Sequence, residues 1–98
     1  MIACVAPSFA QDAKQGRETA RKCVVCHGKL GIAVAPNAPN LAGENAVYVA
    51  AQLKAFKEGR RKNHQMTIIA SSLSDEDIAN LAAWYAAIEV TATAPDFD

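Results

Sequence analysis

Small and apolar residues recur at helical spacing in the first part of the chain. Gly16, Ala20 and Cys23 lie three or four positions apart after Asp12, a residue type that favours helix N-caps, so the pattern predicts a helix over 12–27. Gly16 falls inside this helix, where glycine costs about 1 kcal/mol relative to alanine. We therefore expect a second helix to cross close to its backbone.

Two further stretches have the same periodicity. Residues 44–58 form the second predicted helix, which ends at Gly59. The third predicted helix begins at Ser74, which forms a capping-box pattern with Asp77 in place of the usual Glu. Its apolar stripe consists of Ile78, Leu81, Ala82, Tyr85 and Ile88.

The segments between these helices have no regular pattern. Residues 28–43 are rich in Gly, Pro and Asn, and residues 60–73 begin with a polar run before Met66. No segment has the alternation of a strand. The chain is therefore expected to adopt an all-α fold of three to four helices joined by loops.

Composition indicates one small domain with a thin core. Hydrophobic types make up 51% of the 98 residues, but Ala is the most frequent of them, and an alanine side chain buries little apolar area. A domain of this size has little stability to spare after the entropy of ordering its residues. We expect a group other than protein to complete the core.

The ten basic and ten acidic residues cancel, so no global field favours nucleic acid or an anionic membrane. The charges are nevertheless segregated along the chain. All the Lys and Arg residues lie between Lys14 and Lys62, where only Glu18, Glu44 and Glu58 oppose them. The sequence therefore predicts a basic surface in this segment and no nucleic-acid partner.

The N-terminal residues resemble the end of an export signal. They are uncharged, mostly apolar and end in Ser8-Phe9-Ala10, the small-x-small pattern of a signal-peptidase site. We predict that residues 1–10 are a signal remnant removed after Ala10; the alternative is a frayed terminus that is retained. Cys4 would be removed as well, although it could instead be a lipidated cysteine.

No later apolar run approaches the roughly 20 residues that span a bilayer. We therefore expect an exported, soluble, periplasmic protein without stable membrane insertion.

The sequence Cys23-Val24-Val25-Cys26-His27 carries the clearest chemistry. This CxxCH pattern is the attachment sequence of c-type haem. Two thiols on one helical turn can bond to both vinyl groups of a porphyrin edge, and the adjacent imidazole can then reach the iron. The alternatives are a disulfide or redox dithiol, which would follow a strand, and a zinc site, which would need more ligands than His64 supplies.

Met66 is the candidate for the sixth coordination position of the iron. It is the only Met after Met1, and it lies far enough along the chain to reach the opposite face of the ring. A thioether packs against porphyrin and donates to iron without losing a proton. Met66 could instead be a gap-filling core residue. His64 is a competing ligand, although its polar neighbours favour a solvated loop.

These features resemble the class I c-type cytochromes, in particular the small bacterial monohaem members and the single halves of dihaem relatives. The resemblance covers residues 12–88. Glu44 departs from it, because relatives often have Gln there. The motifs that carry the resemblance are Gly16 seven residues before Cys23, CVVCHG, Pro36, the run Pro39-Asn40-Leu41-Ala42-Gly43, the helix of Tyr48, GRRKNHQM and LSDEDIANLAAWYAAI.

The resemblance implies the class I cytochrome c fold, wrapped around one haem. The haem domain would cover residues 11–91, followed by a flexible C-terminal tail over 92–98. One haem c would be attached by thioether bonds from Cys23 and Cys26.

The resemblance also implies a ligand set for the iron. His27 would be the proximal ligand and Met66 the distal one. The backbone carbonyl of Pro36 would accept a hydrogen bond from the other ring nitrogen of His27, a contact that orients the imidazole. Gly16 would be the point where the first helix crosses the last, against Trp84 or Tyr85.

With both axial positions filled, substrates cannot reach the iron, so we expect a non-enzymatic carrier of one electron with a potential raised by its Met ligand. One alternative is a dedicated cytochrome subunit of a larger oxidoreductase. Another is a ligand-binding or peroxidase-type haem protein in which Met66 leaves the iron.

We expect a monomer or weak dimer that docks briefly on redox proteins with acidic surfaces. The candidate docking residues are basic side chains, which could equally decorate a solvated helix surface. They are Arg17, Arg21, Lys22, Lys29, Lys54, Lys57, Arg60, Arg61 and Lys62.

Overall fold

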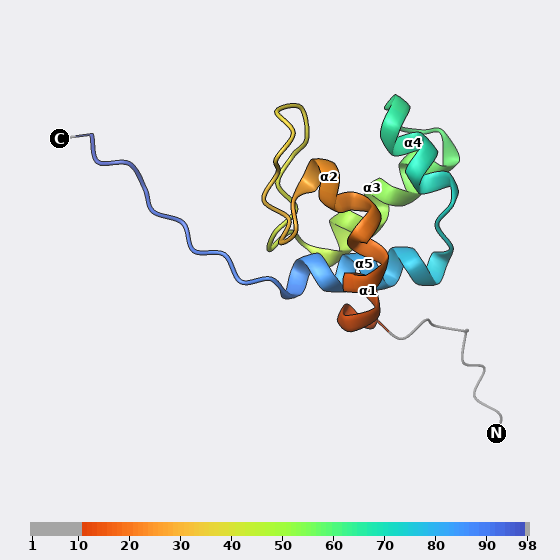
Figure 1. The fold of residues 1–98 in the computed structure, drawn as a ribbon, viewed down its shortest axis with the longest axis horizontal. Helices are drawn as coiled ribbons and strands as arrows, with labels where there is room; N and C mark the ends of the chain where they lie inside the picture. The colour runs from red at the N-terminus through yellow and green to blue at the C-terminus, as the bar shows by residue number, and fades with distance from the viewer. Residues whose placement is uncertain (1–10, 98) are drawn as a thin grey trace, which may run out of the picture.

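The computed structural model describes residues 11–97 (Figure 1). The predicted signal remnant, residues 1–10 with Cys4, lies outside the described residues, as does Asp98. The described part of the chain is helical and contains no strand, which confirms the predicted all-α class.

The first predicted helix is divided into three consecutive segments. They are α1 (Ala13–Thr19), the 3-10 turn η1 (Ala20–Cys23) and α2 (Val24–His27). Asp12 caps α1 as predicted, because its carboxylate accepts hydrogen bonds from two backbone N–H groups of the first turn. The division places the first cysteine of the CxxCH motif at the end of η1 and the second in α2.

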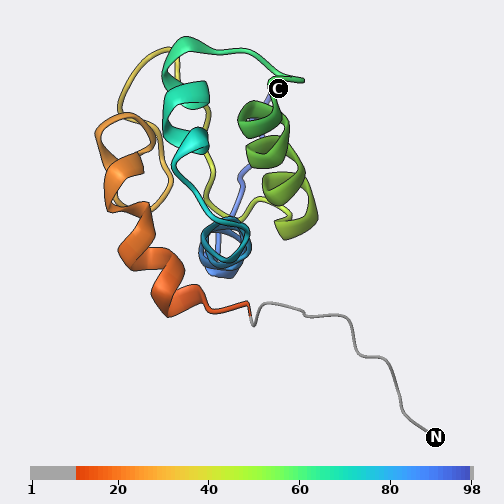
Figure 2. The same cartoon turned by 90° about the vertical axis from the view of Figure 1, so that its right-hand side faces the viewer.

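The last helix, α5 (Asp75–Ala87), is the centre of the fold. Ser74 and Asp77 form the predicted capping box at its start. Figure 2 shows α5 end on, with α1 on one side of it and α3 on the other. Its predicted apolar stripe is buried from Ile78 to Tyr85, and these two side chains are only 1% and 2% exposed.

Helix α1 crosses α5 at Gly16, as the sequence predicts. A Cβ atom at this position would lie 1.9 Å from the backbone oxygen of Asn80 and 2.9 Å from the Cβ of Trp84. The Asn80 side chain also accepts a hydrogen bond of 2.9 Å from the backbone N–H of Asp12. The crossing therefore depends on close backbone contact, which no larger residue at position 16 permits.

Helix α3 (Ala46–Glu58) begins two residues later than predicted, because Asn45 is its N-cap. It packs against α4 and α5. Val49, Ala55 and Phe56 are buried, whereas Val47 is 79% exposed.

Helix α4 (His64–Ser71) lies where an irregular segment is predicted, so the expectation that Met66 lies in a loop is wrong. Asn63 caps the helix by accepting a hydrogen bond of 3.0 Å from the backbone N–H of Met66. Beyond α5, residues 92–97 have no regular secondary structure and extend away from the helices (Figure 1).

Candidate functional site

A cavity of about 380 Å³ lies between α2, the loop after it, α3, α4 and α5. This volume is in the range of small-molecule and cofactor sites. The cavity brings together Cys23, Cys26, His27 and Met66, which the sequence predicts as site residues, but not Pro36. Much of the remaining wall is apolar and comprises Leu41, Val49, Leu53, Phe56, Ile69, Leu81 and Tyr85.

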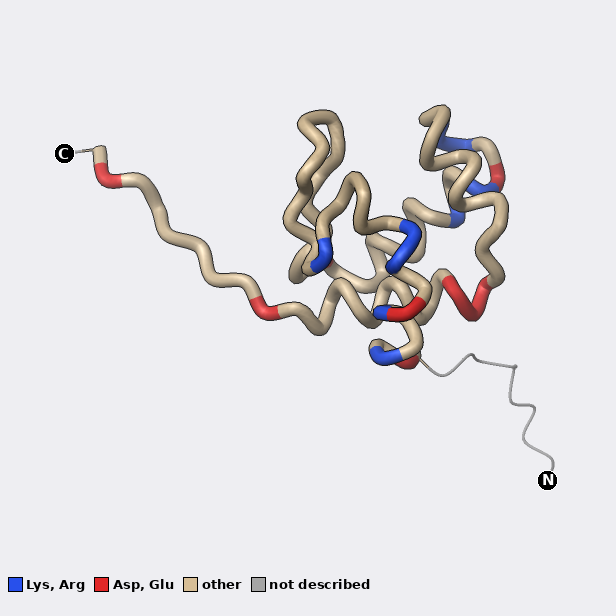
Figure 3. The backbone as a smooth tube through the Cα atoms, in the orientation of Figure 1, with Lys and Arg blue, Asp and Glu red and all other residues tan. Residues whose placement is uncertain are grey.

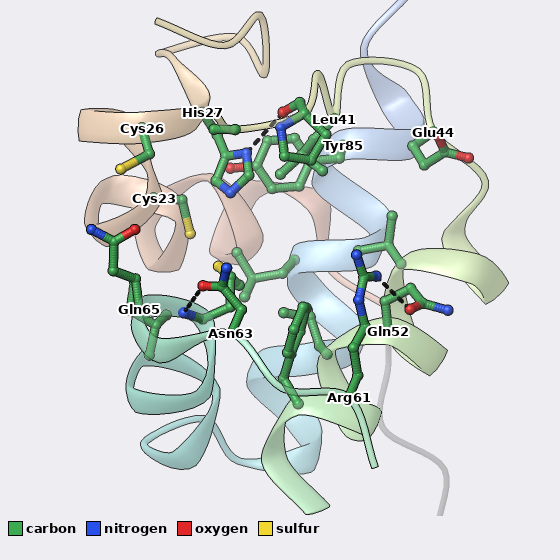
Figure 4. Close-up of a pocket in the computed structure, with 18 of the residues that line it drawn as sticks. Cys23, Cys26, His27, Leu41, Glu44, Gln52, Arg61, Asn63, Gln65 and Tyr85 are labelled. Carbon is green, nitrogen blue, oxygen red and sulfur yellow. Dashed lines mark hydrogen bonds between the residues drawn. The ribbon is translucent and has the colours of Figure 1, made fainter. Parts of the chain in front are cut away.

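The two cysteines of the motif are on one side of the cavity (Figure 4). Both are free thiols, so no disulfide joins them. Burial raises the pKa of the Cys23 thiol, although Tyr85 and Lys22 act in the opposite direction. A redox dithiol of the thioredoxin type needs a lowered thiol pKa, so this environment does not favour that alternative.

The zinc alternative has no support in the described residues. They contain no cluster of three or more His, Cys, Asp or Glu side chains that could hold a metal ion.

His27 is held in one orientation by the protein. Its side chain is buried, with an exposed fraction of 6%. Nδ1 lies 2.9 Å from the backbone oxygen of Pro39. Because a carbonyl only accepts, Nδ1 must donate, and the lone pair is then on Nε2. This is the tautomer that a proximal iron ligand requires, with the orienting contact that such ligands usually have.

The prediction that the carbonyl of Pro36 accepts this hydrogen bond is therefore wrong, because the acceptor is Pro39, three residues later. The backbone N–H of Ala38 donates to the oxygen of Ala35 at 3.1 Å and closes a turn that contains Pro36. Pro36 is exposed in this turn. The chain returns toward His27 only after the turn, so the carbonyl of Pro39 takes the role.

The loop that carries Pro39 is tied to the helices at both ends. Near its start, the backbone N–H groups of Val34 and Ala35 donate to the oxygen of Cys26 at 3.0 and 3.1 Å. At its end, the N–H of Gly43 donates to the oxygen of Tyr85 at 2.8 Å. These bonds fix the acceptor of the His27 hydrogen bond relative to both α2 and α5.

Gly28 allows the tight entry into this loop. Its φ is +81°, and a Cβ there would lie 1.9 Å from the backbone oxygen of Ile32. Any other residue at this position would be strained and would also meet the backbone of the loop.

Met66 reaches the cavity from the first turn of α4 and is half-buried. His64, two residues earlier, does not line the cavity. Residues two apart on an α-helix project in nearly opposite directions, since each residue turns by about 100°. The helix therefore places Met66, and not His64, at the cavity.

Tyr85 is a wall residue that the sequence pattern assigns only to the core. Its hydroxyl is buried beside the Cys23 thiol. Burial raises the pKa of this phenol, and the neighbouring Cys23 adds to the shift. The phenol therefore stays protonated at neutral pH.

The donor set of the cavity fits haem c. Two thiols lie three residues apart beside a buried imidazole with a free Nε2, and a thioether lines the same apolar space. These are the groups that attach a porphyrin and ligate its iron.

The part of the chain that builds this cavity also matches a known family. Residues 11–84 match the family model described as cytochrome C oxidase, cbb3-type, subunit III. The chain belongs to this family of c-type cytochromes. It is a small class I c-type cytochrome, and its cofactor is covalently bound haem c with iron.

Individual relatives agree with this assignment. The chain is 45% identical over 83 residues to cytochrome c-554(548) of Halomonas halodenitrificans, a match that covers 82% of this chain and 100% of that protein. The structure of reduced recombinant cytochrome c4 from Pseudomonas stutzeri has a TM-score of 0.76 at 35% identity, over 82% of this chain and 47% of that one.

A third relative is part of an enzyme. The structure of thiosulfate dehydrogenase from Marichromatium purpuratum has a TM-score of 0.75 at 34% identity, over 87% of this chain and 21% of that one. The chain therefore spans about half of the cytochrome c4 structure and about a fifth of the dehydrogenase. Together these likenesses confirm the class I cytochrome c fold.

The basic residues considered for docking do not gather in one place (Figure 3). Lys22, Arg61 and Lys62 line the haem cavity. Three others, Arg17, Arg21 and Lys29, line a separate groove beside Trp84. Lys57 donates to the backbone oxygen of Leu73. Only part of the predicted basic surface therefore lies next to the site.

None of the described helices is both long and apolar enough to cross a membrane.

Proposed function

We propose that this chain carries single electrons between redox proteins in the periplasm. Haem c, when bound, supplies a one-electron couple between ferrous and ferric iron. In this proposal Cys23 and Cys26 would hold the group by thioether bonds, and His27 and Met66 would be the two protein ligands of its iron. The haem domain is residues 11–91, and residues 92–98 are its tail.

The observation that carries the proposal is the position of Met66. A half-buried thioether lines the same cavity as the oriented imidazole of His27, so this chain could supply both protein ligands of a haem iron. A doubly ligated iron offers no place for a substrate. The chain would then transfer electrons without being an enzyme by itself.

The environment of the site favours the reduced state. A thioether ligand stabilises ferrous iron, and an apolar wall penalises the extra positive charge of the ferric form. Leu81 and Phe56, which form part of this wall, are buried. We therefore expect a higher potential than a bis-imidazole site would have in the same cavity.

Carbon monoxide binding tests whether Met66 stays on the iron. The reduced protein at neutral pH should show no change in its visible spectrum under carbon monoxide, because no coordination position is open. Met66→Ala opens one and serves as the positive control. Rapid binding by the unaltered protein would contradict a carrier and would favour the ligand-binding alternative.

Partners would be redox proteins with acidic docking surfaces. Lys22 and Lys62 line the cavity, and such cations steer acidic partners by long-range attraction. Electron exchange with an acidic partner should therefore slow as salt is added. Lys22→Glu should slow it more than Lys14→Glu, which makes the same charge change away from the cavity. Equal effects would remove Lys22 from the docking surface.

A role as cytochrome subunit of a larger oxidoreductase is the second candidate. It is favoured by the likeness to a segment of a thiosulfate dehydrogenase structure and by the oxidase subunit in the family description. The electron chemistry would be the same, and only the permanence of the complex would differ. Copurification with a dehydrogenase at high salt would favour this candidate over a free carrier.

Export to the periplasm is supported by the Ser8-Phe9-Ala10 pattern. Mass determination of the mature chain would show cleavage after Ala10 if the proposal is correct.

A further inference from the structure

The groove beside Trp84 is a feature to which the proposed function assigns no role. This Trp84 groove has a volume of about 670 Å³ and is lined by residues of α1, η1 and α2, by the start of the loop after α2 and by Trp84 of α5. Three of the lining residues, Arg17, Arg21 and Lys29, are basic and exposed. The groove is therefore an open, cationic depression outside the haem cavity.

The Trp84 groove and the haem cavity share a wall. Cys23 lines the cavity, and the next residue, Val24, lines the groove. In α5, Trp84 lines the groove, and the next residue, Tyr85, lines the cavity. Consecutive helical residues are turned by about 100° from one another, so they can face different spaces. A molecule in the groove would therefore lie against the back of the cavity wall without entering the cavity.

Most of the positive charge in the Trp84 groove is unopposed. Glu18 is the carboxylate of its wall, and it pairs with Arg21 at 2.9 Å. Among the described residues, no carboxylate forms an ion pair with Arg17 or Lys29. The groove therefore has a positive field that attracts an acidic molecule.

Trp84 adds an aromatic surface and an unused hydrogen-bond donor. The central carbon of the Arg17 guanidinium lies 6.0 Å from the centre of the indole ring, at the limit of a cation–π contact. The indole Nε1 is buried and has no hydrogen-bond partner among the described residues. A buried donor without an acceptor is destabilising, so an oxygen from a docked segment would stabilise this wall.

The rest of the wall favours a polypeptide as the occupant. It includes the apolar residues Ala20, Val24 and Leu30, and Leu30 is 55% exposed. A small solvated anion makes no use of such apolar area, and a flat lipid surface does not follow a concave groove. A protein segment with acidic and apolar side chains can contact both the cations and the apolar wall.

We propose that the Trp84 groove is a second docking surface, which binds an acidic segment of a redox protein while the cavity face remains open to another partner. This inference rests on the proposed function, because a carrier exchanges electrons with both a donor and an acceptor. One electron would leave the reduced partner and convert the haem of this chain from ferric to ferrous. No bond forms or breaks, and no proton moves.

Trp84 itself provides the readout for binding, because it is the only tryptophan of the chain. In the reduced, diamagnetic holoprotein its indole N–H gives a single NMR resonance. Hexaglutamate, titrated at low salt, should shift this resonance along a saturable curve, and added salt should weaken the binding. A resonance that does not move would overturn the proposal.

Charge variants test whether the groove itself binds the probe. Arg17→Gln and Lys29→Gln each remove one unopposed cation, so each should weaken hexaglutamate binding about threefold, and together about tenfold. Lys14→Gln is the matched control, because Lys14 is exposed on the same helix and lines neither the groove nor the cavity. K14Q should weaken binding by less than about twofold, since its charge is screened. Equal weakening by all three variants would show attraction without a site and would contradict the proposal.

Electron transfer from a photoreduced acidic ferredoxin is the second readout. At low salt, the double variant R17Q/K29Q should slow reduction of the haem at least about twofold relative to K14Q. Lys22→Gln, on the cavity side of the shared wall, should slow it separately, so that the combined variant is slower than either. If K22Q accounts for the whole loss and R17Q/K29Q for none, the groove does not dock redox proteins.

Vesicles of phosphatidylglycerol and phosphatidylcholine in equal parts test the other occupant. If they shift the indole resonance and hexaglutamate does not, the groove binds a membrane surface and the proposal is wrong. Failure of the proposed function gives a different result. If the unaltered protein binds no haem or is not reduced by the ferredoxin, the carrier is excluded, whereas the indole resonance still shows whether the groove binds an acidic peptide.

Discussion

The crossing of α1 and α5 and the wall of the haem cavity are stabilised in different ways. At the crossing, Gly16 meets the backbone of Asn80, and protein contacts protein with no space for a larger side chain. Around the cavity, the wall is built from short helices, a loop and helix caps that leave about 380 Å³ between them. The crossing is complete without a ligand, whereas the cavity wall requires one to fill it.

This difference explains why such a short chain can fold around a large group. The crossing supplies a fixed frame, to which the loop is tied through the hydrogen bond between Gly43 and Tyr85. The site residues are then attached to that frame by local capping and turn bonds. Substitutions at the crossing should mainly lower the stability of the fold. Substitutions at the cavity wall should mainly affect the attachment and ligation of the haem.

The largest expected effect is at the cavity. The double change Cys23→Ser and Cys26→Ser removes both thioether bonds, so haem should be lost completely from the protein on a denaturing gel stained for haem. Val25→Ala is the control, because Val25 lies between the two cysteines and is 80% exposed. Haem that stays attached in the double variant would refute the covalent assignment.

The next effect is at the crossing. Gly16→Ala places a methyl group 1.9 Å from the oxygen of Asn80, which should destabilise the protein by about 2–3 kcal/mol. The visible spectrum of the folded protein should stay unchanged, because Gly16 does not line the cavity. Chemical denaturation followed by circular dichroism measures the change.

Gly59→Ala is the comparison for this prediction. Gly59 has a φ of +78°, but among the described residues no atom beyond Gly59 and its chain neighbours lies within 4 Å of the place that a Cβ would occupy, so only backbone strain of about 1 kcal/mol applies. If both variants lose the same stability, close contact at the crossing is not the cause.

The smallest predicted effect is a difference between removing the cap of α4 and removing the cap of α3. Asn63→Ala removes the cap of α4 and Asn45→Ala removes the cap of α3, and each should cost about 1 kcal/mol. Only Asn63 bonds to the backbone of Met66, at 3.0 Å. The far-red band of sulfur-ligated ferric haem should therefore weaken on mild heating in N63A and persist in N45A. Identical behaviour of the band in both variants would contradict a role of the α4 cap in ligation.

The crossing of α1 and α5 could be predicted from the sequence because each feature that indicates it involves residues close together in the chain. The stripe of α5, its capping box and the glycine of α1 each specify one structural feature by residue type and spacing. Helix α4 could not be predicted with the same ease, although Met66, Ile69, Ala70 and Leu73 have helical spacing, because the polar run before it is typical of a longer loop.

The details of the wall could be predicted only in part. The CxxCH motif and Met66 identify the donor types. The sequence does not show whether the carbonyl of Pro36 or that of Pro39 accepts the hydrogen bond from His27. Only the turn at Ala35–Ala38 in the structure shows that Pro39 reaches His27. The position of Arg61 depends on the chain reversal after Gly59, which brings it over Phe56. From its residue type alone, Arg61 is expected to be a charged residue on the protein surface.

The proposed function requires that one haem is ligated by His27 and Met66 and transfers single electrons. A reductive titration of the mature protein, followed by visible spectra, tests it most directly. We expect a reversible one-electron transition and a weak far-red band in the oxidised form that disappears on reduction and is absent from Met66→Ala. A colourless protein, or an oxidised spectrum without that band, would contradict it.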